Sequence, residues 1–344
     1  MFENFMFSVN AILPLVLIVL LGYFLKRKKI INEKFFSYGS KFCFYVALPA
    51  SLFKSAYTAD FNKIDWKFIG YCLGFTSIIF IIMLFCTKLF CPEDKQRGVI
   101  IQASFRSNYA YIGIPLAGML FGGDTEIASL MAAFSIPLYN MLSIVALTIF
   151  VKKEDGNKKG FVDCIKGIIK NPLIISIFIA IVLNLSLHGI NSLTAKNGFD
   201  LINSRWIPSL KDGDNSYFAF ISTTVVYIAK LATPLSLFVI GGQFEFASVK
   251  KLAKPIIITV SLRLIIVPVI ALLVATLLFN FNGPEYATMI ALFGTPAAVA
   301  SAIMAKEMDN DGELANQIVV WSTICSAFTL FAIIFVVNAL GYLS

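Results

Sequence analysis

Residues 103–117 read Ala103-Ser-Phe-Arg-Ser-Asn-Tyr-Ala-Tyr-Ile-Gly-Ile-Pro-Leu-Ala117, an apolar run that contains an arginine, an asparagine, a glycine and a proline. A proline inside a helix removes a backbone hydrogen bond and clashes with the preceding turn, and a glycine lets the chain leave helical geometry. In lipid, the freed backbone groups must find partners in the protein, in trapped water or in a ligand. We therefore expect a broken membrane helix that lies inside a bundle and lines a binding site.

The composition of the whole chain is that of a polytopic membrane protein. Of its 344 residues, 58% are hydrophobic and 14% are charged, and the mean hydropathy is +0.82, whereas about a quarter of the residues of a soluble domain are charged. A single histidine, His188, excludes a multi-histidine metal site, and the six cysteines form no Cys-x-x-Cys motif. The apolar runs contain no nucleophile–base pair and no paired aspartates. The expectation is that the protein is not an enzyme and has no catalytic residue, metal or cofactor.

Ten apolar stretches are long enough to be membrane spans. Only Glu3 is charged before the first of them, and a basic segment typical of a cleavable signal is missing there. The ten predicted spans lie near residues 7–25, 35–53, 66–90, 98–121, 127–151, 171–190, 217–244, 255–279, 286–305 and 314–343.

The distribution of basic residues predicts the orientation of these spans. Lysines and arginines are concentrated in the loops that follow odd-numbered spans, above all at 26–29 and 152–170. The positive-inside rule then places the central loop in the cytoplasm and both termini outside, in a multi-pass protein of the plasma membrane. The net charge of +8 follows from this asymmetry, so we expect no nucleic-acid partner.

The chain also contains an internal repeat. Three short motifs recur in the same order, at offsets of 181 to 187 residues: 49–53 with 234–238, 113–117 with 294–298, and 124–128 with 311–315. Each half holds five spans, and an odd number means that the second half enters the membrane from the opposite face. The predicted organisation is therefore a 5+5 inverted repeat, with halves at 1–151 and 171–344 joined by a basic cytoplasmic linker at 152–170.

Inverted repeats whose spans are interrupted at corresponding positions are typical of secondary transporters with a site near the midplane. Spans 4 and 9 are predicted to be broken and to cross at Pro115 and Pro296. The N-terminal ends of half-helices carry partial positive charge and favour an anion. An anionic substrate is therefore expected. A channel would also accommodate broken helices, but the repeat favours alternating access around one site.

The segment Asn108-Tyr-Ala-Tyr-Ile-Gly-Ile-Pro115 resembles the Asn-x4-Gly-[Ile/Leu]-Pro crossover of the auxin efflux carrier family, which includes plant auxin exporters and bacterial malate and malonate permeases. Pro49, Pro234 and Ala305-Lys-Glu307 extend this resemblance, which covers essentially the whole chain. The short mid-loop favours the bacterial permease type.

This resemblance implies a fold similar to that of the bile-acid/sodium symporters. Spans 1, 2, 6 and 7 would form a scaffold, and spans 3–5 and 8–10 a moving transport domain. It also implies elevator-type transport of a small carboxylate such as malate, malonate or an auxin-like acid, often by homodimers in the lipid bilayer. The long loop at 187–218 is a departure whose role the sequence does not indicate.

Two polar residues in the first break are the main candidates for substrate contact. The guanidinium of Arg106 is suited to bind a carboxylate bidentately, or alternatively to snorkel to the interface or pair with an acid. The amide of Asn108 can donate to a carboxylate without adding charge, or can cap the broken helix. Aligning the two prolines pairs Arg106 with Ala287 and Asn108 with Met289, so the two half-sites are expected to differ.

The predicted substrate-binding residues surround the two breaks: Arg106, Asn108, Tyr109, Gly113, Ile114, Pro115, Gly294, Thr295, Pro296 and Ala297. Other polar or aromatic residues in the spans are candidates either for lining the cavity or for packing: Tyr111, Tyr139 and Asn140. Arg263 and Lys230 are candidates for ion pairs or for snorkelling to the interface.

The coupling ion stays open at this stage. Acidic residues lie near span ends, and none occupies a midplane position like that of Arg106. A proton gradient, a sodium site built from carbonyls at the breaks, and uniport or exchange are all compatible with the sequence. The main alternative function is a sodium-coupled organic-anion symporter of the bile-acid type.

Overall fold

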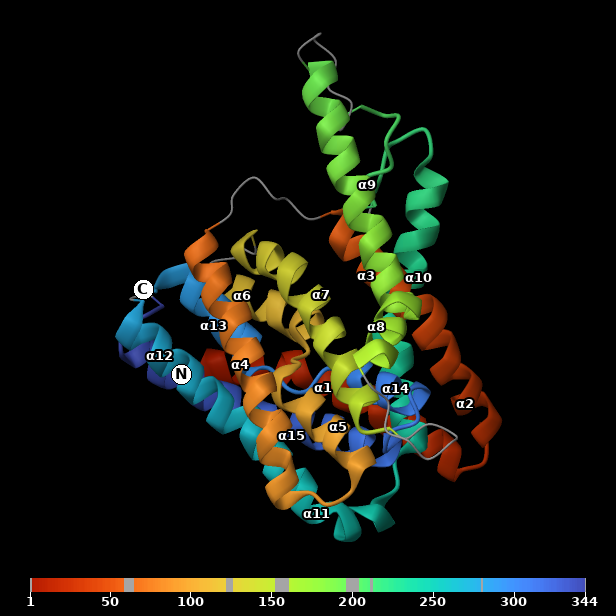
Figure 1. Ribbon diagram of the computed structural model, residues 1–344, viewed down its shortest axis with the longest axis vertical. Helices are drawn as coiled ribbons and strands as arrows, with labels where there is room; N and C mark the ends of the chain where they lie inside the picture. Colours follow the sequence, from red (N-terminus) through yellow and green to blue (C-terminus); the bar gives the residue numbers. More distant parts are fainter. Residues whose placement is uncertain are drawn as a thin grey trace.

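The protein is all-helical in the part of the chain that the structure describes. This computed structural model describes residues 2–58, 65–121, 126–151, 161–195, 204–210, 213–279 and 281–343. Within these ranges there is no strand, and the one β-type contact is an isolated bridge between Ser107 and Ala297. The prediction of an all-α protein is confirmed (Figure 1).

The helices follow the order of the predicted spans. The first half of the chain forms α1 (Phe2–Arg27), α2 (Glu33–Phe42), the π-helix η1 (Cys43–Ala47), α3 (Leu48–Tyr57), α4 (Trp66–Phe90), α5 (Asp94–Phe105), the π-helix η2 (Tyr109–Gly113), α6 (Ile114–Leu120) and α7 (Glu126–Ile149). The second half forms α9 (Pro172–Ala195), α10 (Ala219–Gln243), α11 (Phe246–Ser261), the π-helix η3 (Leu262–Ile266), α12 (Val267–Leu278), α13 (Gly283–Gly294), α14 (Val299–Glu307) and α15 (Gly312–Ala339).

The connection between the halves is partly helical. Residues 152–160 of the predicted linker lie outside the described residues, but α8 (Phe161–Lys170) follows them. Its exposed apolar side chains, Val162, Ile165 and Ile169, alternate with basic residues, a pattern typical of a helix that lies in a membrane interface.

Among the residues that the structure describes, six helices are long and apolar enough to cross a membrane by length and composition: Trp66–Phe90, Ile127–Ile149, Pro172–Asn191, Ala219–Gln243, Ser248–Leu278 and Gly312–Ala339. This supports a polytopic membrane protein. The predicted spans at 98–121 and 286–305 each fall on two helical pieces shorter than the roughly 20 residues that one spanning helix needs. The ten-span inverted repeat and its two halves stay predictions.

Helix starts are specified locally by side chains that accept hydrogen bonds from the first free backbone N–H groups. The Asp65 carboxylate accepts from the N–H groups of Lys67 and Phe68 at 2.8 and 3.2 Å, where α4 begins. Asp311 accepts from Leu314 N–H at 2.9 Å, where α15 begins. Such caps satisfy donors that the helix itself leaves unpaired.

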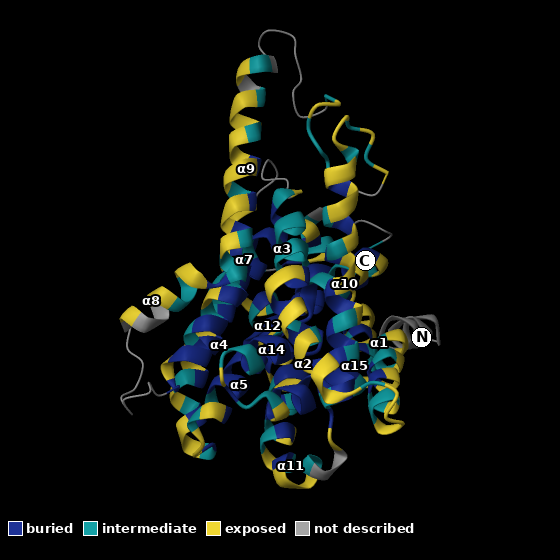
Figure 2. Cartoon of the chain, turned by 90° about the vertical axis from the view of Figure 1, so that its right-hand side faces the viewer, coloured by how far each residue is buried: buried dark blue, intermediate teal, exposed yellow. Residues whose placement is uncertain are grey.

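The most buried helix is α13, in which every residue from Tyr286 to Gly294 is buried. Figure 2 shows buried residues concentrated in the body of the bundle, whereas the upper parts of α9 and α10 project from it and are largely exposed. The long loop predicted at 187–218 is therefore partly helical, because α9 continues to Ala195. Residues 196–203 and 211–212 of this loop lie outside the described residues.

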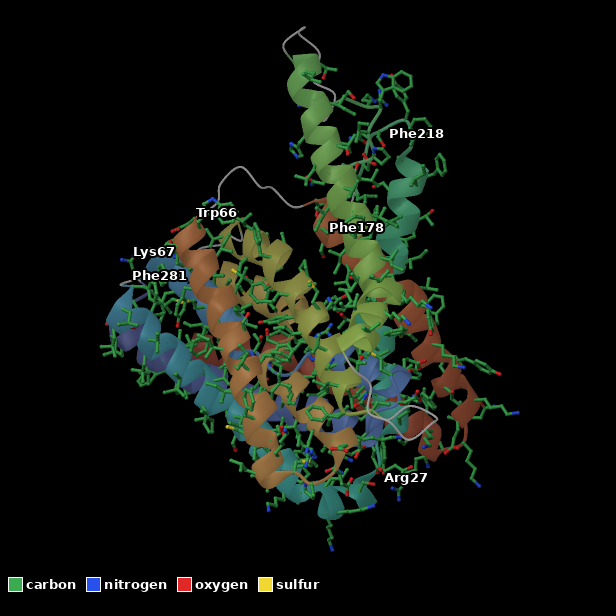
Figure 3. The ribbon with its side chains drawn as sticks, in the orientation of Figure 1. Arg27, Trp66, Lys67, Phe178, Phe218 and Phe281 are labelled. Carbon is green, nitrogen blue, oxygen red and sulfur yellow. The ribbon has the colours of Figure 1, made fainter. Side chains whose placement is uncertain are left out.

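Aromatic and basic side chains mark the two ends of the bundle (Figure 3). The Lys67 ammonium lies 5.7 and 5.6 Å from the ring centroids of Phe279 and Phe281, next to Trp66 at the start of α4. Arg27, at the end of α1, lies at the opposite end of the bundle. Aromatic rings combined with basic groups are typical of the membrane interface.

Helices α1 and α10 pack backbone to backbone, because glycines face the partner helix. A Cβ added at Gly241 would overlap the carbonyl oxygen of Val19, and one added at Gly22 would overlap that of Phe238. Small residues permit such close approach and let van der Waals contact hold membrane helices together.

The substitution Gly241→Ala is expected to push α1 and α10 apart and to destabilise the protein by about 2 kcal/mol or more, as overpacking does. The measurement is the thermal midpoint of the purified protein in detergent. Gly74→Ala is the matched control, since Gly74 is also in a long apolar helix and its added Cβ has nothing within 4 Å. Equal midpoints for the two variants would contradict the close contact.

Candidate functional site

Two interrupted segments meet in the middle of the fold and are hydrogen-bonded to each other. Helix α5 ends at Phe105 before η2 begins at Tyr109, and α13 ends at Gly294 before α14 begins at Val299. Between them, the Asn108 N–H donates to the Pro296 carbonyl at 2.8 Å, and the Ala298 N–H donates to the Arg106 carbonyl at 3.3 Å. The two bonds are symmetric about the antiparallel bridge between Ser107 and Ala297.

This geometry corrects the predicted crossing point in the first half. Pro296 lies at the crossing, but Pro115 is exposed and lies further along the chain, where η2 continues directly into α6. The chain leaves helical geometry earlier, at Arg106 (φ −87°, ψ 109°) and Asn108 (φ −80°, ψ 49°). The prediction that the segments cross at Pro115 is wrong.

The equivalence of residues in the two halves changes accordingly. The two hydrogen bonds are related by a local two-fold symmetry about the bridge between Ser107 and Ala297. Under this symmetry the donor Asn108 is equivalent to the donor Ala298, and the acceptor Arg106 to the acceptor Pro296. The partners predicted by aligning the two prolines, Ala287 and Met289, are not the residues that this bridge relates to Arg106 and Asn108. Ala287 and Met289 both lie within α13, one or two turns before its end. The two half-sites still differ chemically, because the polar side chains come from the first half.

Arg263 holds the ends of the two interrupted helices. Its side chain, on η3, is 0% exposed. Its Nε donates to the Thr295 carbonyl at 3.0 Å. Its Nη1 and Nη2 atoms donate to four more carbonyls at 3.0 to 3.3 Å, those of Ser104, Phe105, Leu292 and Phe293. Neither of the roles predicted for Arg263, an ion pair or snorkelling, matches this arrangement.

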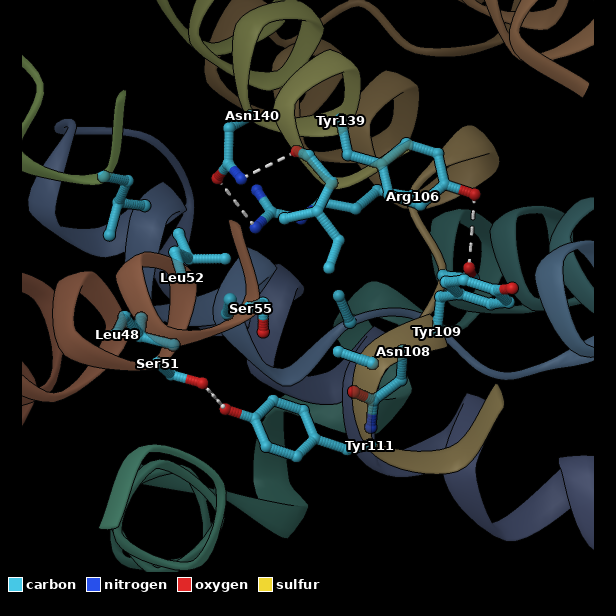
Figure 4. A pocket seen from close by; sticks show the side chains of 16 residues that line it. Leu48, Ser51, Leu52, Ser55, Arg106, Asn108, Tyr109, Tyr111, Tyr139 and Asn140 are labelled. Atoms are coloured by element: carbon cyan, nitrogen blue, oxygen red, sulfur yellow. Dashed lines mark hydrogen bonds between the residues drawn. The ribbon is translucent and has the colours of Figure 1, made fainter. Parts of the chain in front are cut away.

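A small cavity of about 50 Å³ lies beside the crossing (Figure 4). Its walls come from α3, the segment from Arg106 to Tyr111, α7, the start of α9 and the start of α14. The lining residues are Leu48, Ser51, Leu52, Ser55, Arg106, Ser107, Asn108, Tyr109, Ala110, Tyr111, Ile136, Tyr139, Asn140, Leu173, Ala298 and Ala300. This volume has room for a few water molecules and is below the roughly 300 Å³ at which ligand pockets usually begin.

Arg106 lines this cavity and is 4% exposed. Its guanidinium donates to Asn140 Oδ1 at 3.0 Å, to Ser143 Oγ at 3.2 Å and to the sulfur of Met304. All three acceptors are neutral. The side chain thus neither snorkels to an interface nor pairs with an acid, and Figure 4 shows it facing Asn140 at the cavity.

Asn108 also lines the cavity and is 3% exposed. Its backbone N–H is satisfied across the crossing, but its side-chain Nδ2 is buried and has no hydrogen-bond partner among the described residues. Its side chain makes no capping bond to the helix that follows. A buried amide donor without an acceptor costs about 1–3 kcal/mol, so this atom is suited to receive an acceptor from a ligand.

Of the eight remaining predicted residues, one lines the cavity and seven do not. Tyr109 lines the cavity and donates its hydroxyl to the Ala128 carbonyl at 2.8 Å. The Thr295 hydroxyl donates to the Ala291 carbonyl at 2.8 Å and so points into its own helix. The predicted residues that are not in the cavity wall are Gly113, Ile114, Pro115, Gly294, Thr295, Pro296 and Ala297.

One wall of the cavity was not predicted from sequence. Ser51 and Ser55 lie one helical turn apart on α3, and the Ser51 and Tyr111 hydroxyls are hydrogen-bonded at 2.7 Å. The signal that could have identified them is their spacing: two hydroxyls at i and i+4, directly after Pro49 in an apolar span, lie on one helix face. Tyr139 and Asn140, which were open between lining and packing, lie in the wall.

The two buried arginines near the crossing have only neutral hydrogen-bond acceptors among the described residues, and none of those acceptors is a carboxylate. Among the side chains whose burial the structure describes, the buried charged ones are Arg106 and Arg263, and none is an aspartate or glutamate. The described residues also contain no group of three or more His, Cys, Asp or Glu side chains that could hold a metal ion. A buried cation is costly without a counter-charge, so this arrangement favours binding of an anion.

Comparisons with known proteins give one family. The sequence profile described as "Membrane transport protein" matches residues 7–334. An uncharacterized transporter of Methanothermobacter thermautotrophicus is 23% identical over 95% of this chain and 97% of its own length. The uncharacterized transporter YfdV of Escherichia coli K12 is 23% identical over 88% of this chain and 89% of its own. The chain belongs to the membrane transport protein family, the family of the auxin efflux carriers.

Proposed function

We propose that this protein is a secondary transporter that carries a small organic carboxylate, such as malate, malonate or an auxin-like acid, across the plasma membrane. The observation that carries the proposal is the pairing, in one cavity wall, of the buried Arg106 guanidinium with the unpartnered Nδ2 of Asn108. A carboxylate has two oxygens, so one can accept from a guanidinium while the other accepts from an amide.

The position of the cavity supports alternating access. Its walls combine α3 and α9, which belong to the predicted scaffold, with the segment after α5, with α7 and with α14, which belong to the predicted transport domain. A site at the boundary of two bodies opens and closes when one body moves against the other. The cavity of about 50 Å³ is smaller than usual ligand pockets, so a bound carboxylate would need further space.

A sodium-coupled organic-anion symporter is the second candidate within the same fold. It shares the anion site, and it requires a bound cation near the breaks. The two candidates differ in one measurable property, the dependence of flux on sodium.

The direct test is flux of radiolabelled malate and malonate into proteoliposomes under separately imposed proton and sodium gradients. We expect saturable uptake that depends on one imposed gradient. Uptake that responds to pH and not to sodium favours a proton-linked permease, and sodium-dependent uptake favours the symporter. Absence of flux for both acids under every gradient would contradict this substrate class.

Asn108→Ala and Arg106→Ala are each expected to reduce flux at least tenfold, because each removes a donor worth about 1.5–3 kcal/mol to a charged acceptor. Arg106→Lys keeps the charge but loses the bidentate fork and should fall between these variants and the wild type. Asn338→Ala, at an exposed asparagine at the end of α15, is the control. Wild-type flux in both alanine variants, with normal insertion, would remove the site assignment.

The proposed orientation has both termini outside and the loop 152–170 in the cytoplasm. In a variant whose six cysteines are replaced, a membrane-impermeant maleimide should label Ser344→Cys in intact cells, and should label Lys158→Cys only after permeabilisation. The opposite pattern would reverse the predicted topology.

A further inference from the structure

Backbone carbonyls at the crossing need hydrogen-bond donors or a cation, because they lie in the apolar interior of the protein. Helices α5 and α13 both end there, and the last carbonyls of a helix have no partner within it and carry partial negative charge. Two such ends lie together, contributed by residues far apart in the chain. In transporters with discontinuous helices, half-helix ends and unwound carbonyls of this kind coordinate a coupling cation.

In this protein the carbonyls are already occupied by a side chain. A guanidinium has five N–H donors in a planar fork, and Arg263 makes five hydrogen bonds to carbonyls of the two chain ends, at 3.0 to 3.3 Å. The three acceptors Leu292, Phe293 and Thr295 come from one end, and Ser104 and Phe105 from the other. The donor set and the acceptor set are thus matched in number, and the side chain is fully buried.

We propose that Arg263 is a built-in cation that takes the place of a coupling sodium ion at the crossing. This inference rests on the proposed transport function, which it deepens by assigning the ion dependence. A fixed guanidinium neutralises the helix ends in every step of the cycle, so transport and stability need no sodium there. The residue acts by positioning the two chain ends and does not itself contact the substrate, since it is not in the cavity wall.

The geometry also explains why arginine is suited to this position. A lysine ammonium is a compact charge with three donors, too few for five carbonyls. Arg263 projects from η3, and this π-helical turn packs against both α5 and α13. One side chain therefore joins three helical segments, as a bound sodium ion would. Unlike the ion, the side chain is covalently attached and cannot dissociate.

The test compares thermal midpoints of purified protein in sodium chloride and in N-methyl-D-glucamine chloride of equal ionic strength, with and without millimolar guanidinium. The wild-type midpoint should be the same in both salts. Arg263→Ala should melt lower, by on the order of 10 °C, and added guanidinium should restore part of this loss saturably, because a ligand that binds only the folded state stabilises it. Arg205→Ala, at an exposed arginine near Tyr217, is the matched control and should show no rescue.

If Arg263→Ala does not fold, the thermal midpoints of the wild-type protein and of Arg263→Lys in the two salts still test whether sodium stabilises the crossing. A saturable rise of the wild-type midpoint with sodium, sodium-dependent flux of the wild type, or equal guanidinium rescue in Arg205→Ala would each overturn the inference. The thermal midpoints are measured without any transported substrate. Failure of malate flux would therefore count against the proposed function while leaving this test intact.

Discussion

The architecture depends on satisfying backbone groups where two helices stop inside the protein. The first N–H groups of the resumed chain pair across the crossing, as the bonds from Asn108 to Pro296 and from Ala298 to Arg106 show. The terminal carbonyls pair with Arg263. Since an unsatisfied backbone group in an apolar medium costs several kcal/mol, these partners are what allows two chain breaks to exist at the centre of an apolar bundle.

The candidate site follows from this arrangement. Because the backbone at the break is satisfied by the other segment and by Arg263, the side chains of Arg106 and Asn108 are not used as caps and face the cavity instead. Arg106 is held by neutral acceptors, so its charge is oriented but not neutralised. The same constraint that stabilises the fold thus leaves one cation and one amide donor without a matching anion.

The sequence allowed prediction of the helical class, and it singled out the segment 103–117, in which α5 ends at Phe105 and from which Arg106 and Asn108 line the cavity. Polar residues in an apolar run have a local signature. The sequence did not locate the crossing correctly. Pro115 and Pro296 were aligned at an offset of 181 residues, whereas the observed bridge from Ser107 to Ala297 has an offset of 190. The role of Arg263 could not be predicted, because its carbonyl partners are backbone atoms up to 159 residues away in the chain. Every residue type has a backbone carbonyl, so the sequence does not show which residues accept these hydrogen bonds.

The contacts around the cavity also bear on how such a site could open. The hydrogen bond between Tyr111 and Ser51 joins the break to α3, on opposite sides of the proposed boundary between scaffold and transport domain. A neutral hydrogen bond of this kind contributes only about 1 kcal/mol, so this bond adds little to the cost of separating the two sides. A carboxylate that enters would supply an acceptor to Asn108 and a counter-charge to Arg106, two interactions that the cavity lacks without a ligand. Carboxylate binding would therefore favour a conformation with a larger cavity. A neutral molecule of the same size could supply an acceptor to Asn108 but no counter-charge to Arg106.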